Sequence, residues 1–229
     1  MAVDDENTVA LLHMDGADAS TTFTDESGKT WTAANYAQID TAQYKFGGAS
    51  GLFDGTGDYI TTGDSADWDI GSGNFTIDFW YRPNALGNYN LCGQGENTAN
   101  LSLWSWYMQH AASNQIVSVI ISGTSQYQAY STGTVAVGNW YHVAVVRNGN
   151  NLTTYLNGTG GTPKNVTGVT ANNSSQAVSI GRLGSRAALY TNGWIDEFRF
   201  SKGIARWTVN FTPPTAPYGQ STGNFLAFF

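Results

Sequence analysis

"NWYHVAVVRNGNNLTTYLNG", residues 139–158, has the pattern of a β-hairpin. Its first arm is apolar at successive positions, so both faces of that strand are expected to be buried, as in the middle of a sheet. Asn148 and Gly149 supply the turn chemistry that joins two antiparallel strands. The second arm spans residues 152–156. The stretch therefore predicts an antiparallel sheet with this hairpin inside it.

Further strands are predicted on both sides of the hairpin. In GNFTIDFWYRP (73–83) the side chains alternate with a period of two until Pro83 ends the strand. One strand each is predicted by NQIVSVIISG (114–123), QAVSIGRLG (176–184) and GWIDEFRFS (193–201), and a pair by ASGLFDGTGDYITTG (49–63), around the turn at 54–57.

The chain lacks a helical pattern. No apolar repeat of about 3.6 residues is sustained, so at most one or two short helical turns are expected, one of them near residues 65–68. The 27 glycines stand between short apolar runs as turn residues. About a dozen short strands of this kind predict an all-β protein, a two-sheet antiparallel β-sandwich of the jelly-roll type.

The 229 residues fit one β-sandwich domain by length. We divide the chain into a short acidic leader (1–7), the sandwich (8–218) and an apolar tail (219–229). Soluble monomers seldom expose such an end, so the tail either folds back onto the sandwich or docks on another chain. We predict subunit attachment, most simply in a homo-oligomer, through Phe225, Leu226, Phe228 and Phe229.

Charge and cysteine content exclude several classes of protein. The formal net charge is −7 and the 10 basic residues are scattered singly, so nucleic acid is not an expected partner. Residues 1–16 carry acids where a secretory signal carries bases, and their apolar run is too short to span a membrane. We therefore expect no signal peptide and no membrane insertion. Cys92 is the one cysteine, which excludes an internal disulfide and a multi-cysteine zinc site.

The strand in GWIDEFRFSKGIARW (193–207) raises a question about Asp196. Strict alternation along the strand places Asp196 on the same face as the aromatic residues Trp194, Phe198 and Phe200. A carboxylate left unpaired there would be destabilising or would take up a proton. Catalysis, a metal ion or hydrogen bonds to another segment would each explain it.

Aromatic residues supply a candidate binding surface. In LSLWSWYMQH (101–110), Trp104 and Trp106 are expected on one face of a strand. Such a pair belongs either to the core, which is the commoner arrangement, or to a platform on which sugar rings stack. The other candidates for a binding rim are Tyr89 and Tyr127, expected in loops, and Arg147, at the hairpin.

Four segments of the chain match a known family in their order. They are LLHMDGADASTTFTDESGKTWTA (11–33), AQYKFGGASGLFDGTGDYITTGDSADWDIGSGNFTIDFWYRP (42–83), GNWYHVAVVRNGNNLTTYLNG (138–158) and GWIDEFRFSKGIARWTVNFTPPTAPY (193–218). In this order they resemble laminin-G-like domains of the concanavalin A-like lectin/glucanase superfamily. The HMDG opening and the FTPPTAP close look especially like the copies found in bacteriophage and marine viral structural proteins.

The resemblance implies a jelly roll with one concave sheet that is often used for binding. Members that carry a metal usually hold one Ca²⁺ through a carboxylate on the strand near the C-terminus and oxygens of the N-terminal segment. Asp196 stands at that strand position, and Asp15 with the carbonyls around Gly47 and Gly48 would complete the site. One structural Ca²⁺ is thus one explanation of Asp196, and main-chain N–H groups that donate to it are the other.

The resemblance also defines what catalysis would require. Glucanases on this fold resemble one another in a Glu-x-Asp-x-Glu run, which places two carboxylates at a distance suited to acid/base and nucleophile roles. Here the corresponding strand has Asp78 alone, and the adjacent Asp196 and Glu197 are expected to point to opposite faces. No Gly-x-Ser-x-Gly motif appears. We therefore expect no catalytic residue and no enzyme activity.

These observations leave three functions open. The preferred one is a non-catalytic virion surface protein, a capsid decoration or tail-associated protein made in the host cytoplasm. It would attach to other virion proteins, and host or environmental glycans are its second predicted partner. The first alternative is an extracellular, carbohydrate-binding, lectin-like module of a bacterial surface protein. The second is a glycan-cleaving enzyme.

Overall fold

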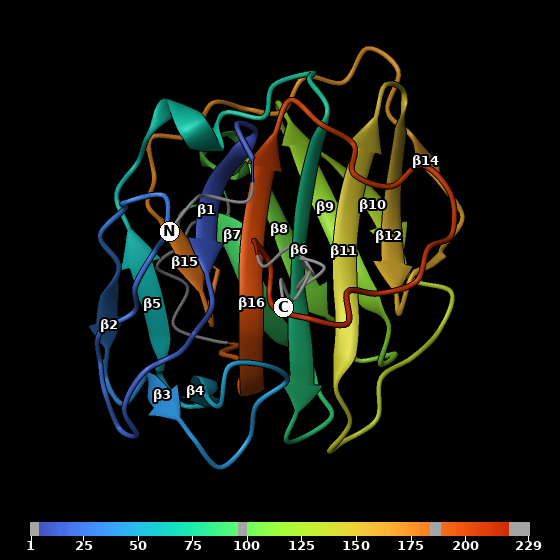
Figure 1. Cartoon of the computed structure of the whole chain (residues 1–229). Helices are drawn as coiled ribbons and strands as arrows, with labels where there is room; N and C mark the ends of the chain where they lie inside the picture. Colours follow the sequence, from blue (N-terminus) through green and yellow to red (C-terminus); the bar gives the residue numbers. More distant parts are fainter. Residues whose placement is uncertain (1–4, 96–99, 184–188, 220–229) are drawn as a thin grey trace, which may run out of the picture.

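The computed structural model describes residues 5–95, 100–183 and 189–219. Two antiparallel sheets, A in front and B behind, form a sandwich (Figure 1). The predicted all-β, concanavalin A-like sandwich is confirmed.

The outer face of sheet A is the one that residues 203–218 cross (Figure 1). The sheet consists of β1 (Thr8–Leu12), β3 (Gln38–Asp40), β4 (Ser50–Asp54), β6 (Phe75–Pro83), β11 (Tyr141–Asn148), β12 (Asn151–Leu156), β13 (Thr159–Gly160), β14 (Lys164–Asn165) and β16 (Asn192–Lys202). Neighbours follow the order β13-β12-β11-β6-β16-β4-β3, while β1 pairs with β16 and β14 with β12. The edge formed by β12, β13 and β14 borders the candidate site described below.

Sheet B has seven strands in the part of the chain that the structure describes. They are β2 (Thr32–Ala34), β5 (Tyr59–Thr62), β7 (Tyr89–Gln94), β8 (Trp106–His110), β9 (Ile116–Ser122), β10 (Ser125–Tyr130) and β15 (Val178–Ile180). Their order is β10-β9-β8-β7-β15-β5-β2. The two strands predicted around residues 54–57 thus lie in different sheets, because the turn carries the chain from one layer to the other.

The strongest sequence patterns became the central strands. The predicted hairpin is β11 and β12, with Asn148 opposite Asn151 at its turn. The two helical elements are 3₁₀ turns, η1 (Ala66–Trp68) and η2 (Leu101–Leu103). Within the described ranges, no helix is long and apolar enough to cross a membrane.

Aromatic side chains fill the space between the sheets. Phe79 of β6 stacks on Phe198 of β16 with ring centroids 5.9 Å apart. Trp106 of β8 meets Phe200 of β16 edge to face at 5.2 Å, so this contact joins sheet B to sheet A. Each such side chain contributes about 1.5–3 kcal/mol through burial.

A β-bulge in β16 changes which side chains face this core. Asp196 pairs with Trp80, the register then shifts, and Arg199 pairs with Asp78. Glu197 occupies the shift with a φ of 52°. One extra residue in a strand reverses the alternation beyond it.

The bulge corrects two expectations from the sequence. Phe198 and Phe200 are core residues, whereas Asp196 accepts hydrogen bonds from a surface loop. The prediction that Asp196 shares its face with these two aromatics is therefore wrong. So is the prediction that Asp196 and Glu197 point to opposite faces, since Glu197 also contacts an outer segment.

That outer segment, residues 203–218, is called the strap. It runs from the end of β16 toward the edge at β12 and β14, and returns across the front of sheet A (Figure 1). It has no strand of its own. Single main-chain hydrogen bonds, such as that from Phe211 N–H to the carbonyl of Gly158 at 2.9 Å, and side-chain contacts therefore hold it in place.

Candidate functional site

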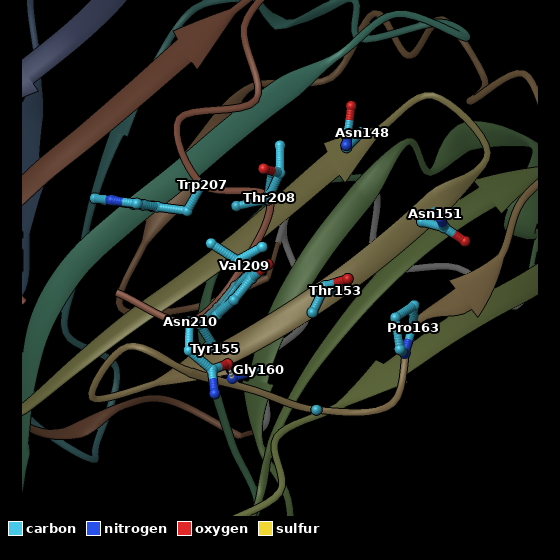
Figure 2. Close-up of a pocket in the computed structure, with 12 residues that line it drawn as sticks. Asn148, Asn151, Thr153, Tyr155, Gly160, Pro163, Trp207, Thr208, Val209 and Asn210 are labelled. Carbon is cyan, nitrogen blue, oxygen red and sulfur yellow. Dashed lines mark hydrogen bonds between the residues drawn. The ribbon is translucent and has the colours of Figure 1, made fainter. Parts of the chain in front are cut away.

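A pocket of about 200 Å³ lies between the strap and the β12 edge of sheet A (Figure 2). We call it the strap pocket. It is lined by Val146, Asn148, Asn151, Thr153, Tyr155, Gly160, Gly161, Pro163, Trp207, Thr208, Val209 and Asn210.

Stacked aromatic rings fix the strap wall of this pocket. Trp207 lies on Phe211 with ring centroids 3.9 Å apart and planes 7° from parallel. Both rings meet His142 edge to face, at 5.5 and 5.6 Å, and Phe211 also packs on Tyr155 at 5.4 Å. The wall is therefore a packed layer rather than an open loop.

The lining of the strap pocket carries no Asp, Glu, Lys, Arg or His. The side-chain amides of Asn148 and Asn151 are exposed, and the described part of the chain offers them no side-chain hydrogen-bond partner. Asn210 Oδ1 accepts the N–H of Gly160 at 2.9 Å, which leaves its amide N–H groups to donate. The site suits a ligand with uncharged hydrogen-bonding groups.

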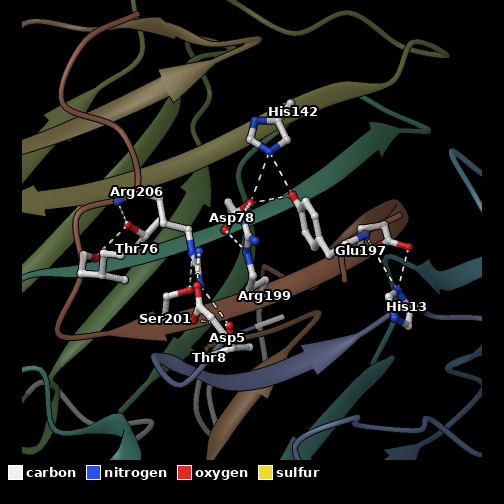
Figure 3. A network of polar contacts seen from close by, with 12 residues as sticks. Asp5, Thr8, His13, Thr76, Asp78, His142, Glu197, Arg199, Ser201 and Arg206 are labelled. Carbon is white, nitrogen blue, oxygen red and sulfur yellow. Dashed lines mark hydrogen bonds and ion pairs between the residues drawn. The ribbon is translucent and has the colours of Figure 1, made fainter. Parts of the chain in front are cut away.

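A buried ion pair anchors the strap from below (Figure 3). Arg199 donates to Asp78 through Nε (3.1 Å) and Nη2 (3.0 Å). The Tyr218 hydroxyl donates to the same carboxylate at 2.5 Å, and His142 Nε2 lies 3.0 Å from that hydroxyl. Burial alone would raise the pKa of Asp78, but the charge of Arg199 and the contact with His142 hold it well below its usual range.

Glu197 supplies a second anchor for the strap. Its Oε2 accepts the main-chain N–H of Tyr218 at 2.8 Å, and His13 Nδ1 lies 2.9 Å from Oε1 (Figure 3). The hydrogen bond with Glu197 raises the pKa of His13. Asp78, which occupies the glucanase-like strand position, is fully buried and serves this structural network.

Asp196 binds a surface loop on the same side of the sheet. Its Oδ2 accepts main-chain N–H groups of Lys45 (2.7 Å) and Phe46 (3.0 Å), as one of the two explanations of this residue predicted. Its Oδ1 is buried and has no hydrogen-bond partner in the described structure. The pKa of Asp196 is raised to about 8, mainly by burial and in smaller part by the charges of Glu197 and Asp15.

The same loop also contacts Asp15. Gly47 has a φ of 64°, and a Cβ there would lie 2.1 Å from Asp15 Oδ1, so only glycine lets the carboxylate approach this closely. Desolvation raises the pKa of Asp15 as well. A bound cation would stabilise the ionised forms of Asp196 and Asp15 and so lower the pKa of each.

These residues fit a calcium ion in part. Calcium takes about six to eight oxygen ligands. The unpaired Oδ1 of Asp196 and the carboxylate of Asp15 would supply some of them. Among the described residues, no three His, Cys, Asp or Glu side chains form a metal-binding group. Main-chain carbonyls of the loop at Gly47 and Gly48 would have to supply other ligands.

The predicted aromatic platform does not form. Trp106 is 1% exposed and lies in the core, whereas Trp104 packs with Tyr107 and Leu183 in a separate cluster. Trp104 ends the turn η2 and precedes β8, so strand alternation does not apply to it. The prediction that both tryptophans share a face is wrong.

The predicted rim residues are also placed differently. Tyr89 begins β7 and Tyr127 lies within β10, so neither is in a loop. Arg147 is buried, and its guanidinium donates to the carbonyls of Gly71 and Val169, which makes it a brace between loops. Phe225, Leu226, Phe228 and Phe229, predicted for subunit attachment, lie outside the described residues.

The sequence reasoning missed the residues of the strap pocket. A signal was present in the Asn-rich turn 148–151 and in Trp207, which follows the last predicted strand. Neither signal indicates that the strap folds back over β12. That contact joins segments about 50 residues apart, as between Asn210 and Gly160.

We predict that Asp78→Asn lowers the free energy of unfolding by about 3–5 kcal/mol, because Arg199 would stay buried without its counter-charge. Urea denaturation at pH 7 measures this. The folded pKa of Asp78 lies below its ordinary 3.8, so the stabilisation holds above that pH and is lost as pH falls below it. Tyr218→Phe, which removes one hydroxyl, should cost only about 1 kcal/mol. A comparably small loss for Asp78→Asn would contradict the anchoring role.

We predict that calcium raises the melting temperature of the protein and that Asp196→Asn abolishes the increase. At free calcium about 100 times Kd, a native-state site contributes about 2.7 kcal/mol. Differential scanning calorimetry with calcium and with EDTA measures the effect. Asp18→Asn, a change at an exposed carboxylate that accepts from Thr41, is the matched control. Equal melting temperatures with calcium and EDTA would leave the hydrogen-bonding role of Asp196 alone.

Comparisons with known proteins agree with this architecture. Residues 54–205 match the Laminin_G_3 family, described as the concanavalin A-like lectin/glucanases superfamily. No curated protein sequence matches the chain.

Two solved structures with the same fold are binding domains of toxins. The binding domain of Paraclostridial Mosquitocidal Protein 1 is 16% identical, with a TM-score of 0.68 over 87% of this chain and 50% of its own. The ligand binding domain of botulinum neurotoxin serotype D in complex with N-acetylneuraminic acid is 14% identical, with a TM-score of 0.60 over 87% and 48%. This chain thus spans about half the length of these toxin domains.

A third structure matches over nearly its whole length. Domain 4 of AbnA, a GH43 extracellular arabinanase from Geobacillus stearothermophilus, in complex with arabinotriose, is 15% identical, with a TM-score of 0.65 over 87% of this chain and 94% of its own. Identities this low speak to fold alone. On the family match, which covers more than half of its residues, this chain belongs to the concanavalin A-like lectin/glucanase superfamily, in its Laminin_G_3 family.

Proposed function

We propose that this domain binds carbohydrate at the strap pocket and cleaves no glycan itself. The observation that carries the proposal is the lining of the pocket, which combines side-chain amides and hydroxyls with the aromatic residues Tyr155 and Trp207 and, among the described residues, has no charged group. Sugars present hydroxyl groups to amides and C–H faces to aromatic rings. A neutral oligosaccharide therefore matches the site.

The arrangement of carboxylates supports a binding role. Retaining and inverting glycosidases use two carboxyl groups on either side of the scissile bond. No carboxylate lines the strap pocket. Asp78 and Glu197 are fully buried and hold Tyr218, so the strap would have to leave before either could reach a substrate.

Two of the similar structures were solved with sugars, arabinotriose on the arabinanase domain and N-acetylneuraminic acid on the botulinum neurotoxin domain. They support the proposal by showing that this fold accommodates glycans. The choice of sugar here follows from the residues of this chain alone.

Attachment to a virion through the C-terminal tail is a separate hypothesis, with location on a particle surface and homo-oligomer formation as its corollaries. It rests on the sequence of residues 219–229 and on the resemblance to phage proteins. It is compatible with glycan binding, because the strap pocket and the tail are different parts of the chain. A structural calcium ion at Asp196 would likewise support either role.

We predict that the double variant Asn148→Ala/Asn151→Ala binds neutral oligosaccharides about tenfold more weakly than the parent, because two hydrogen bonds to the ligand are lost. Arabinan, galactan and β-glucan oligosaccharides are the ligands, and isothermal titration calorimetry gives Kd. Asn139→Ala, at another exposed asparagine, should leave Kd unchanged. Absence of binding to every glycan tested would refute the proposed function.

We predict that the protein releases no reducing ends from arabinan, galactan, β-glucan or alginate above a buffer control, since no carboxylate of the described residues lines the strap pocket. A reducing-sugar assay over a long incubation measures this. Asp78→Ala serves as the check on contamination. Release by the parent that disappears in Asp78→Ala would overturn the non-catalytic assignment.

A further inference from the structure

We propose that the glycan site continues from the strap pocket across Pro163 into a second pocket, where Lys164 receives a negatively charged sugar residue. This inference rests on the proposed function and adds a ligand class, an oligosaccharide with an acidic unit such as a uronate or a sialic acid.

The second pocket lies beside the strap pocket, at the edge of the sandwich where β10 of sheet B meets β14 of sheet A. Its volume is about 370 Å³, and it is lined by Gln115, Gln128, Tyr130, Ser131, Thr132, Thr162, Pro163 and Lys164. Pro163 belongs to both linings and stands at the border of the strap pocket in Figure 2. We call the second one the edge pocket.

The two pockets are held in a fixed relation. Thr132 Oγ1 donates to the carbonyl of Gly160 at 3.0 Å, and Gly161 donates to the carbonyl of Thr154 at 2.9 Å. A Cβ on Gly161 would lie 1.8 Å from the carbonyl oxygen of Tyr130, so this glycine allows the end of β10 to touch the segment 160–164. A ligand would therefore meet a preformed surface.

The sizes favour one ligand across both pockets. Ligand sites usually measure about 300–1,000 Å³. The strap pocket, at about 200 Å³, is below that range, and the edge pocket, at about 370 Å³, is near its lower end. Together they fall within it, as expected for a chain of several sugar units.

Charge gives the edge pocket its selectivity. The whole chain has a net charge of −7, yet among the described residues neither pocket is lined by Asp or Glu, and Lys164 is the one charged residue in either lining. Lys164 is exposed, and within the described ranges no carboxylate forms an ion pair with it. An acidic sugar would supply the missing counter-charge without repulsion from the lining.

Polar groups around Lys164 are already oriented. The Tyr130 hydroxyl donates to Gln128 Oε1 at 2.5 Å, so its oxygen can still accept a hydrogen bond. Gln115 Nε2 donates to the carbonyl of Ser131 at 2.8 Å and keeps a second N–H. Side chains that are held before binding lose less entropy when a ligand arrives.

The test uses pairs of ligands that differ in charge and otherwise only by a methyl group on each carboxyl. Hexagalacturonate is compared with its methyl ester, and 3′-sialyllactose with its methyl ester, by isothermal titration calorimetry at low and at high salt. At low salt the acidic member of a pair should bind about 3- to 10-fold more tightly, as one partly exposed charge-assisted contact provides. The difference should shrink as salt screens the charge. The two pairs distinguish a uronate from a sialic acid as the source of the charge.

Lys164→Gln should abolish the preference for the acidic member while leaving the Kd of the neutral member unchanged. Lys202→Gln, the same change of net charge on β16 outside both pockets, should retain the preference. Equal affinity for acidic and neutral members in the parent, or an equal loss in Lys202→Gln, would overturn the inference while the proposed function stands. Failure of all four ligands, together with the neutral glycan panel, would refute both.

Discussion

The β-bulge at Glu197 decides which side chains of β16 face the core and which face the strap. A non-glycine residue with a φ of 52° costs about 1–3 kcal/mol, so the surrounding contacts must compensate. They do so on both faces. Phe198 turns into the core beside Phe79, and Arg199 turns outward to pair with Asp78. Without the extra residue, the aromatics and the charges of the second half of β16 would exchange places.

The outward charges create the surface on which the candidate site is built. Asp78 and Glu197 hold the hydroxyl and the main-chain N–H of Tyr218, which fixes the far end of the strap. The rings of Trp207 and Phe211 then complete the layer over sheet A. Burial of ionised groups is unfavourable unless each is paired, and this strap is the element that closes the network from outside. The pocket wall and the buried network therefore depend on each other, although none of the charged groups lines the pocket.

Sequence patterns predicted the fold well and the candidate site poorly, for physical reasons. The alternation in 73–83 and the hairpin at 139–158 are local signals, and both became central strands of sheet A. The partner of Asp196 is a loop about 150 residues away, which resemblance indicated in part and periodicity did not. The bulge left no mark in the alternation of 193–202, because a bulge is recognised by its pairing with a neighbour. Arg147 was predicted as a rim residue and is a buried brace between loops. An arginine next to a turn can take either position, and the sequence alone does not distinguish them.

The position of the strap also explains why recognition would move to the edge of the sandwich. Sheet A offers its outer face in the middle, over β6 and β16, but there the strap covers it with Tyr218 and Trp207. Exposed amides remain beside residues 207–210 of the strap, at Asn148 and Asn151, next to the buried Tyr155. A ligand bound there would contact the strap and the sheet together, so it would favour the closed arrangement over one with the strap released. A ligand at the strap pocket and the buried ion pair of Asp78 and Arg199 are thus both expected to stabilise the arrangement in which the strap packs on sheet A. Ligand binding would then depend on the same ion pair that holds the strap.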